Sequence, residues 1–123
     1  MKTIEISVMN PKEDLARVVV LARRIDGGES LPEAVPKLNF ASLKQLFSAI
    51  TEKRMELIRF VAAREGLNTR QLAQALGRDY KSVYKDVREL CEYGLLGKDE
   101  KGGVNAPYDQ IVIRAGLRDT QAA

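Results

Sequence analysis

Histidine is absent from this chain of 123 residues, and cysteine occurs once, at Cys91. Without histidine the chain lacks the commonest general base and the commonest metal ligand, so a catalytic triad or a metal centre loses most of its support. The sequence also contains no phosphate-binding glycine loop and no nucleophile–base pairing. We therefore expect a protein that is not an enzyme and that holds no cofactor or metal, with Cys91 as a small packing residue.

Long apolar runs are missing too, and the longest purely apolar stretch is Val18 to Ala22. Such a stretch is too short to span a bilayer, and no charged-then-apolar signal peptide opens the chain. One cysteine forms no intrachain disulfide, which fits a reducing compartment. We expect a cytoplasmic protein with no membrane contact, large enough to bury a core in one domain with extensions.

The chain has only a small excess of positive over negative charges. Lys and Arg number 20 against 17 for Asp and Glu, which gives a formal net charge of +3. That surplus permits nucleic-acid binding without requiring it, and it is divided between the two halves of the chain. Any affinity for DNA must therefore come from the local placement of charges.

Residues 1–37 are predicted to form an N-terminal strand–helix extension. Thr3 to Val8 alternates apolar and polar residues, as a half-buried edge strand does. Asn10-Pro11-Lys12-Glu13 then provides a helix start, and this helix is predicted to end near Asp26, before Gly27. The proline-containing segment Glu29 to Lys37 has no usable period and is predicted to be a connector.

Two helices are expected next, after a short strand at Leu38-Asn39-Phe40 that is able to pair with Thr3 to Val8. The capping pair Ser42 and Gln45 begins the first helix, and Thr51 caps the second. The predicted buried face of the first helix consists of Leu43, Leu46, Phe47 and Ile50. That of the second consists of Met55, Ile58, Val61 and Ala62, with Leu57 and Phe60 outside it.

The segment Asn68 to Tyr93 has the pattern of a helix-turn-helix. Asn68 with Gln71 caps a helix over Thr69 to Leu76, Gly77 and Arg78 form the turn, and Asp79 caps the second helix. We expect this second helix to bury Tyr80, Val83, Val87 and Leu90. At about 100° per residue, the opposite side then carries Lys81, Ser82, Lys85 and Arg88, which suits the edge and backbone of DNA.

The helix-turn-helix is followed by the signals of a β-hairpin. Gly94 is placed to end the helix in the left-handed conformation, and Leu95-Leu96 is predicted to resume as a strand. Asp99 to Gly103 supplies the turn of a hairpin of the kind called a wing, and Ile111 to Ile113 is a further strand candidate. The predicted fold is mainly α with a small β component: a winged helix-turn-helix over residues 38–115, with a loose tail at 116–123.

Three segments carry a family resemblance: Thr51 to Ile58, Gln71 to Val83, and Pro107-Tyr108-Asp109. From about Phe40 to Ile113 the chain resembles small prokaryotic winged-helix proteins described as predicted transcriptional regulators, similar to the MarR group. The resemblance implies binding to double-stranded DNA and transcriptional control, with autoregulation of its own operon. Some members look like the antitoxin half of toxin–antitoxin pairs.

The predicted DNA-binding residues form three groups. Those expected to hold phosphates are Asn68, Thr69, Arg70 and Arg78. Those on the helix expected to enter the major groove are Tyr80, Lys81, Ser82, Lys85 and Arg88. Those on the hairpin, Lys98 and Lys101, are candidates for phosphate or minor-groove contacts. Tyr84 is left open between core and contact, and Glu89 and Glu92 are expected to turn the end of the helix away from DNA.

A single winged helix makes a small contact, so a homodimer with two recognition helices about 34 Å apart is the expected assembly. The N-terminal unit is the candidate interface, although it is nearly as well explained as a cover for the core. The alternative function is that of an antitoxin-like or adaptor protein, which binds a protein partner such as a toxin through this unit.

Overall fold

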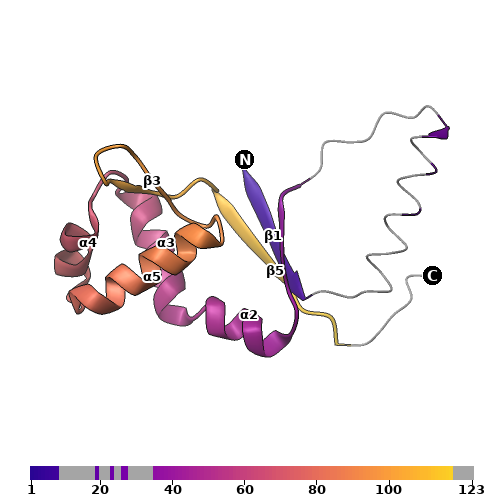
Figure 1. The fold of residues 1–123 in the computed structure, drawn as a ribbon, viewed down its shortest axis with the longest axis horizontal. Helices are drawn as coiled ribbons and strands as arrows, with labels where there is room; N and C mark the ends of the chain where they lie inside the picture. The colour runs from indigo at the N-terminus through magenta and orange to yellow at the C-terminus, as the bar shows by residue number, and fades with distance from the viewer. Residues whose placement is uncertain (9–18, 20–22, 24–25, 28–34, 118–123) are drawn as a thin grey trace. The chain divides into compact units, whose positions relative to one another are not determined.

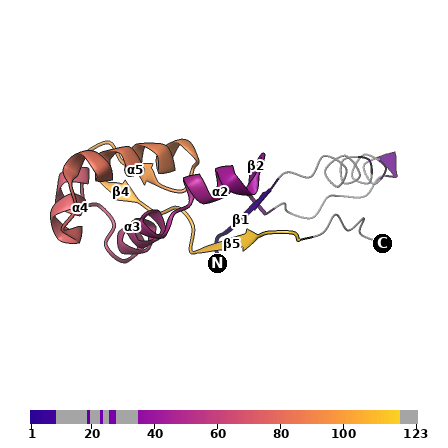
Figure 2. The ribbon, with the colours of Figure 1, turned by 90° about the horizontal axis from the view of Figure 1, so that it is seen from below.

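The structure, a computed structural model, describes residues 1–8, 19, 23, 26–27 and 35–117 (Figures 1 and 2). Its elements are β1 (Thr3–Val8), β2 (Lys37–Phe40), α2 (Leu43–Ala49), α3 (Glu52–Ala63), α4 (Thr69–Leu76), α5 (Tyr80–Glu92), β3 (Gly97–Lys98), β4 (Val104–Asn105) and β5 (Gln110–Arg114). The predicted combination of mainly helical structure with a small β component is confirmed.

The chain divides into two compact units. The helical unit comprises Met1–Lys2 and Phe47–Gln110, and the sheet unit comprises the described residues within Thr3–Leu46 and Ile111–Ala123. The predicted functional boundaries at residues 37 and 115 stay predictions.

In the sheet unit, β1 lies between β2 and β5. The predicted pairing with β2 is confirmed, and it is parallel, with Ile6 opposite Leu38. The prediction that β1 is an edge strand is wrong, because its second neighbour, β5, comes from the other end of the sequence and leaves no local signal. Ile4 and Ile6 are buried, while the Glu5 carboxylate joins both neighbours by ion pairs to Lys37 (4.0 Å) and Arg114 (3.0 Å).

The predicted N-terminal helix lies largely outside the described residues, as do its start at Asn10-Pro11-Lys12-Glu13, most of the connector and residues 118–123 of the tail. Val19, Arg23 and Asp26 are helical, and Gly27 forms a turn whose N–H donates to the Arg23 carbonyl at 3.0 Å. The turn at Gly27 agrees with a helix end near Asp26.

Helix α2 begins as predicted, with Ser42 Oγ accepting the Gln45 N–H at 3.2 Å. Its buried side was predicted in part wrongly. Leu43 and Phe47 are 40% and 61% exposed, and the buried side chains are Leu46, Ala49 and Ile50. In a helix of seven residues only one narrow side meets the core, and the small Ala49 occupies it in place of the larger side chains.

Helix α3 is capped by Thr51 as predicted, but its core face is displaced from the expected one. Its buried residues are Arg54, Leu57, Ile58 and Val61, whereas Ala62 is exposed and Met55 only half-buried. The prediction differed from the structure because Arg54 is buried. Sequence periodicity assigns an arginine to the surface, so the predicted core face left it out. Once Arg54 is placed on the inner side, Leu57 follows it three residues later.

Helices α4 and α5 have the bounds predicted from their caps. Asn68 and Gln71 form a reciprocal capping box, Gly77 has φ +64°, and Asp79 Oδ2 accepts the Ser82 N–H at 3.1 Å. Leu72 of α4 and the stripe Val83, Val87 and Leu90 of α5 are fully buried. The predicted burial of Tyr80 is wrong: as the first residue of α5 it lies at the margin of the stripe and is 43% exposed.

The hairpin after α5 is also present, with β3 and β4 antiparallel and Lys98 opposite Val104. The strand begins at Gly97 rather than at Leu95, because the N–H groups of Leu95 and Leu96 both donate to the Leu90 carbonyl and fold the chain into a bend. Val104 pins the hairpin to the segment before α4: its carbonyl accepts from Gly66 (3.0 Å) and its N–H donates to Leu67 (2.8 Å).

Gly103 has a close backbone approach that makes it a specific probe of this hairpin. A Cβ atom there would lie 2.8 Å from the Gly66 carbonyl oxygen and 2.5 Å from Asp99 Oδ2. We expect Gly103→Ala to lower the free energy of unfolding by about 1–3 kcal/mol in urea denaturation, as overpacking does. The matched control is Gly97→Ala, whose Cβ would have its nearest contacts with the mobile end of the Asn105 side chain, at 2.9 Å, rather than with backbone. Equal losses in the two variants would contradict this packing.

Candidate nucleic-acid interface

The outward side of α5 carries three cations. Lys81, Lys85 and Arg88 are exposed and lie three or four residues apart, opposite the buried stripe of the helix. Within the described part of the chain, none of the three forms an ion pair with a carboxylate. Their ammonium and guanidinium groups are therefore available to an anionic partner.

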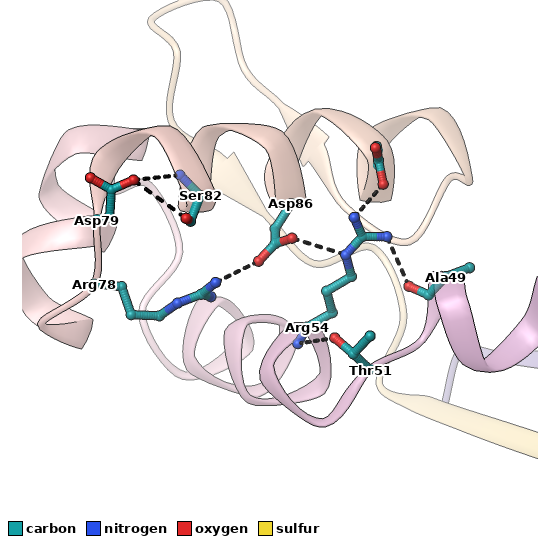
Figure 3. Close-up of polar contacts among 8 residues, drawn as sticks. Ala49, Thr51, Arg54, Arg78, Asp79, Ser82 and Asp86 are labelled. Carbon is teal, nitrogen blue, oxygen red and sulfur yellow. Dashed lines mark hydrogen bonds and ion pairs between the residues drawn. The ribbon is translucent and has the colours of Figure 1, made fainter.

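Two of the acidic residues of α5 turn the other way, toward α3 (Figure 3). Asp86 accepts from Arg54 Nε at 2.9 Å and from Arg78 Nη2 at 2.7 Å, and Glu89 accepts from Arg54 Nη2. The remaining Arg54 nitrogen, Nη1, donates to the Ala49 carbonyl at 3.0 Å. These four charged residues, the Arg54 network, join α3, the α4–α5 turn and α5.

Arg54 is only 6% exposed, so its charge must be compensated from within the protein. Burial by itself lowers the pKa of Arg54, but the hydrogen bonds and charges of Glu89 and Asp86 outweigh it and raise the pKa above its usual value. With two cations and two anions, the Arg54 network has no net charge. Two of the three carboxylates of α5, Asp86 and Glu89, are thus neutralised on the inner side, whereas Glu92 is exposed at the end of the helix.

This arrangement changes the expected role of Glu89. We expected Glu89 and Glu92 to repel phosphate from the end of α5, but Glu89 is paired with Arg54. Glu92 is exposed, as expected. The exposed basic side consequently extends along α5 to Arg88.

The predicted phosphate contacts at α4 and the turn differ in how accessible they are. Arg70 is exposed, whereas Thr69 is 8% exposed and its hydroxyl has little free surface. The Asn68 side chain is engaged in the capping box. Arg78 is half-buried and pairs with Asp86 at 2.7 Å, and its contact with a phosphate stays a prediction.

Tyr80 and Tyr84 form a row with two cations from other elements. Tyr84 is 44% exposed, which decides the open question in favour of surface rather than core. The two ring centroids lie 6.0 Å apart, the Arg70 guanidinium lies 5.4 Å from the Tyr80 centroid, and the Lys98 ammonium lies 5.8 Å from that of Tyr84. Arg70, Tyr80, Tyr84 and Lys98 together are called the tyrosine row below.

A pocket of about 300 Å³ adjoins one end of this row, between α4 and the start of α5. Its lining consists of Arg70, Ala73, Gln74, Arg78 and Tyr80. Two arginines, an amide and a phenol in one depression make its chemistry suited to anions.

The remaining predicted residues keep their surface positions. Ser82 is exposed, with its hydroxyl 3.3 Å from Asp79 Oδ2, and Lys101 is exposed at the turn of the hairpin. In that turn, Asp99 Oδ1 accepts hydrogen bonds from the N–H groups of Lys101 and Gly103. These bonds partly compensate the negative charge of Asp99 beside Lys98 and Lys101.

Cys91 is half-buried, at the border of the α5 stripe. Burial raises the pKa of its thiol above the usual value, and the opposing charge of Lys98 is the smaller effect. The thiol is therefore protonated near neutral pH, as suits a packing residue.

The model of the HVO_A0114 family matches residues 49–113, more than half of the chain, and the chain belongs to this family. The matched residues include α3, α4, α5, both hairpin strands and most of β5. No curated protein and no solved structure matches the chain. In the part of the chain that the structure describes, no helix combines the length and apolar character needed to cross a membrane.

Because of the Arg54 network, we expect substitution of Arg54 to lower the free energy of unfolding far more than substitution of its neighbour Lys53. Arg54→Met removes a cation that pairs with Asp86 and Glu89, whose side chains are only 13% and 28% exposed, while Asp86 keeps its bond to Arg78. We expect the substitution to lower the free energy of unfolding by about 3 kcal/mol, the cost of removing one partner from a largely buried ion pair. The control is Lys53→Met, an exposed cation on the same helix, which should change stability little. A loss for Arg54→Met no greater than that of the control, in urea denaturation, would show that the network does not hold α5.

Proposed function

We propose that this protein is a sequence-specific DNA-binding transcriptional regulator of the winged helix-turn-helix type, similar to the MarR group. In this proposal α4 and α5 are the helix-turn-helix, α5 is the recognition helix, and the β3–β4 hairpin is the wing. The gene that it controls is proposed to be in its own operon.

The observation that carries the proposal is the division of charge on α5. Asp86 and Glu89 face inward and pair with Arg54, whereas Lys81, Lys85 and Arg88 face outward. The major groove of B-DNA is about 12 Å wide and admits an α-helix, and Lys and Arg donate to the O6 and N7 atoms of guanine. A helix with an uncompensated basic side fits that groove far better than one with alternating charges.

Contacts outside the groove would set the register of the protein on the duplex. The capping box uses the Gln71 N–H, and the N–H groups of Thr69 and of the exposed Arg70, which precede it in α4, suit a phosphate. On the hairpin that follows α5, Lys98 and Lys101 are exposed and suit a second phosphate contact. Such contacts add affinity without reading sequence.

We also propose a homodimer, which would present two α5 helices to successive turns of the same groove, about 34 Å apart. The exposed apolar side chains of α2, Leu43 and Phe47, support an interface with another protein chain. The alternative function is that of an antitoxin-like or adaptor protein that binds a protein partner through the N-terminal unit, residues 1–37, and exposed apolar side chains on the adjoining α2 equally suit such a partner.

The test of DNA binding is the double variant Lys81→Ala/Lys85→Ala. With duplex DNA from upstream of the protein's own gene, we expect affinity to fall by about 1–3 kcal/mol for each side chain that reads a base, measured by electrophoretic shift. For each phosphate that the variant no longer binds, the dependence of log K on log salt should flatten by about one unit.

The control is Lys53→Ala/Arg59→Ala, which removes the same charge from exposed positions on α3. It should bind nearly as the parent does. If the two double variants weaken binding equally, the attraction is a property of net charge, and α5 is not the recognition helix.

The homodimer is tested by sedimentation of the full chain and of Leu43→Ser/Phe47→Ser. We expect the parent to sediment as a dimer and the variant as a monomer, because each substitution removes apolar area from the interface. A monomeric parent would contradict the homodimer and favour the adaptor alternative. A variant that remains dimeric would place the interface elsewhere.

A further inference from the structure

We infer that Tyr80 and Tyr84 are positioning residues, which hold Arg70 and Lys98 in place for two DNA phosphates beside the groove occupied by α5. The inference rests on the proposed function and assigns a role in the phosphate contacts of α4 and the hairpin to two tyrosines of α5. The tyrosine row joins Arg70 of α4 and Lys98 of β3 through two rings on α5.

Both rings lie on the surface although tyrosine carries a large apolar area. Tyr80 and Tyr84 are four residues apart on the same side of α5, so their rings are neighbours along the helix, with centroids 6.0 Å apart and planes tilted by 36°. The face of each ring is covered by a cation at a centroid distance below 6 Å, the range of a cation–π contact. Each exposed ring is thus in contact with one cation.

The held cations keep their hydrogen-bond donors. A guanidinium has five N–H donors and an ammonium has three, so a cation beside an aromatic face keeps donors for a second partner. Neither Arg70 nor Lys98 forms an ion pair with a described carboxylate. Arg70 also lines the pocket together with Gln74, whose amide can donate to the same phosphate.

Positioning matters because free Arg and Lys side chains sample many rotamers, and binding a phosphate removes that freedom. A ring that restricts the cation beforehand lowers this entropic loss. A cation–π contact at an exposed site corresponds to about a twofold to fivefold change in an equilibrium constant. The effect of each tyrosine should therefore be modest and should depend on its cation.

The experiment compares leucine and phenylalanine at both positions in the full chain, with duplex binding followed across salt. Phenylalanine keeps the ring face and removes the hydroxyl, whereas leucine removes both. We expect Tyr80→Leu and Tyr84→Leu each to weaken binding about twofold to fivefold and to flatten the salt dependence, and Tyr80→Phe and Tyr84→Phe to bind as the parent does.

Double variants decide whether the tyrosine acts through its cation. In the Arg70→Ala background Tyr80→Leu should have no further effect, and Tyr84→Leu should have none in the Lys98→Ala background. The crossed pair, Tyr84→Leu with Arg70→Ala, is the control and should show additive losses. Additive losses in the matched pairs would overturn the inference.

Three further outcomes overturn it as well. Phenylalanine variants as weak as leucine variants would show that the hydroxyls contact DNA themselves. Tighter binding of the single strand than of the duplex, abolished in the leucine variants, would make the rings a stacking platform for bases. Leucine variants equal to the parent would leave the rings without a role, whereas a parent that binds no duplex would contradict the proposed function itself.

Discussion

The ion pairs of Arg54 are the interaction on which the rest of the helical unit depends. A guanidinium that is only 6% exposed requires anionic partners close by, and α5 supplies them as Asp86 and Glu89. Since both partners lie on one side of α5, their bonds to Arg54 hold that helix in the same rotation about its axis that burial of Val83, Val87 and Leu90 favours. The buried stripe and these bonds together determine which residues of α5 face the solvent.

The rotation of α5 explains how a chain with a net charge of only +3 acquires a basic surface. Arg54 and Arg78 neutralise two carboxylates inside, and Lys81, Lys85 and Arg88 are left outside without an acidic partner among the described residues. A short, local basic surface of this kind favours one docking geometry on a polyanion. In the proposed function, stability and DNA binding thus depend on the same arrangement of charges.

Sequence reasoning predicted the element bounds better than the buried faces. The ends of α4 and α5 follow from local chemistry at Asn68, Gly77 and Asp79, so neighbouring residues suffice to predict them. Arg54 lies inside because its partners, Asp86 and Glu89, are 32 and 35 residues away in the sequence. Tyr80 lies outside because it is at the margin of the buried stripe of α5. Periodicity assigns charged residues to the surface and aromatic residues to the core, and it was wrong at both positions. The cations on α5 were predicted correctly because their outward direction follows from the buried stripe alone.

NMR titration of the labelled protein with duplex DNA from upstream of its own gene shows whether the outward side of α5 binds the duplex. We expect the largest amide shift changes in residues 80–88, with smaller ones at the start of α4 and in residues 97–101, and we expect added salt to reverse them. Changes confined to β1, β2 and β5, or no changes under conditions of low salt, would contradict binding by this side of α5.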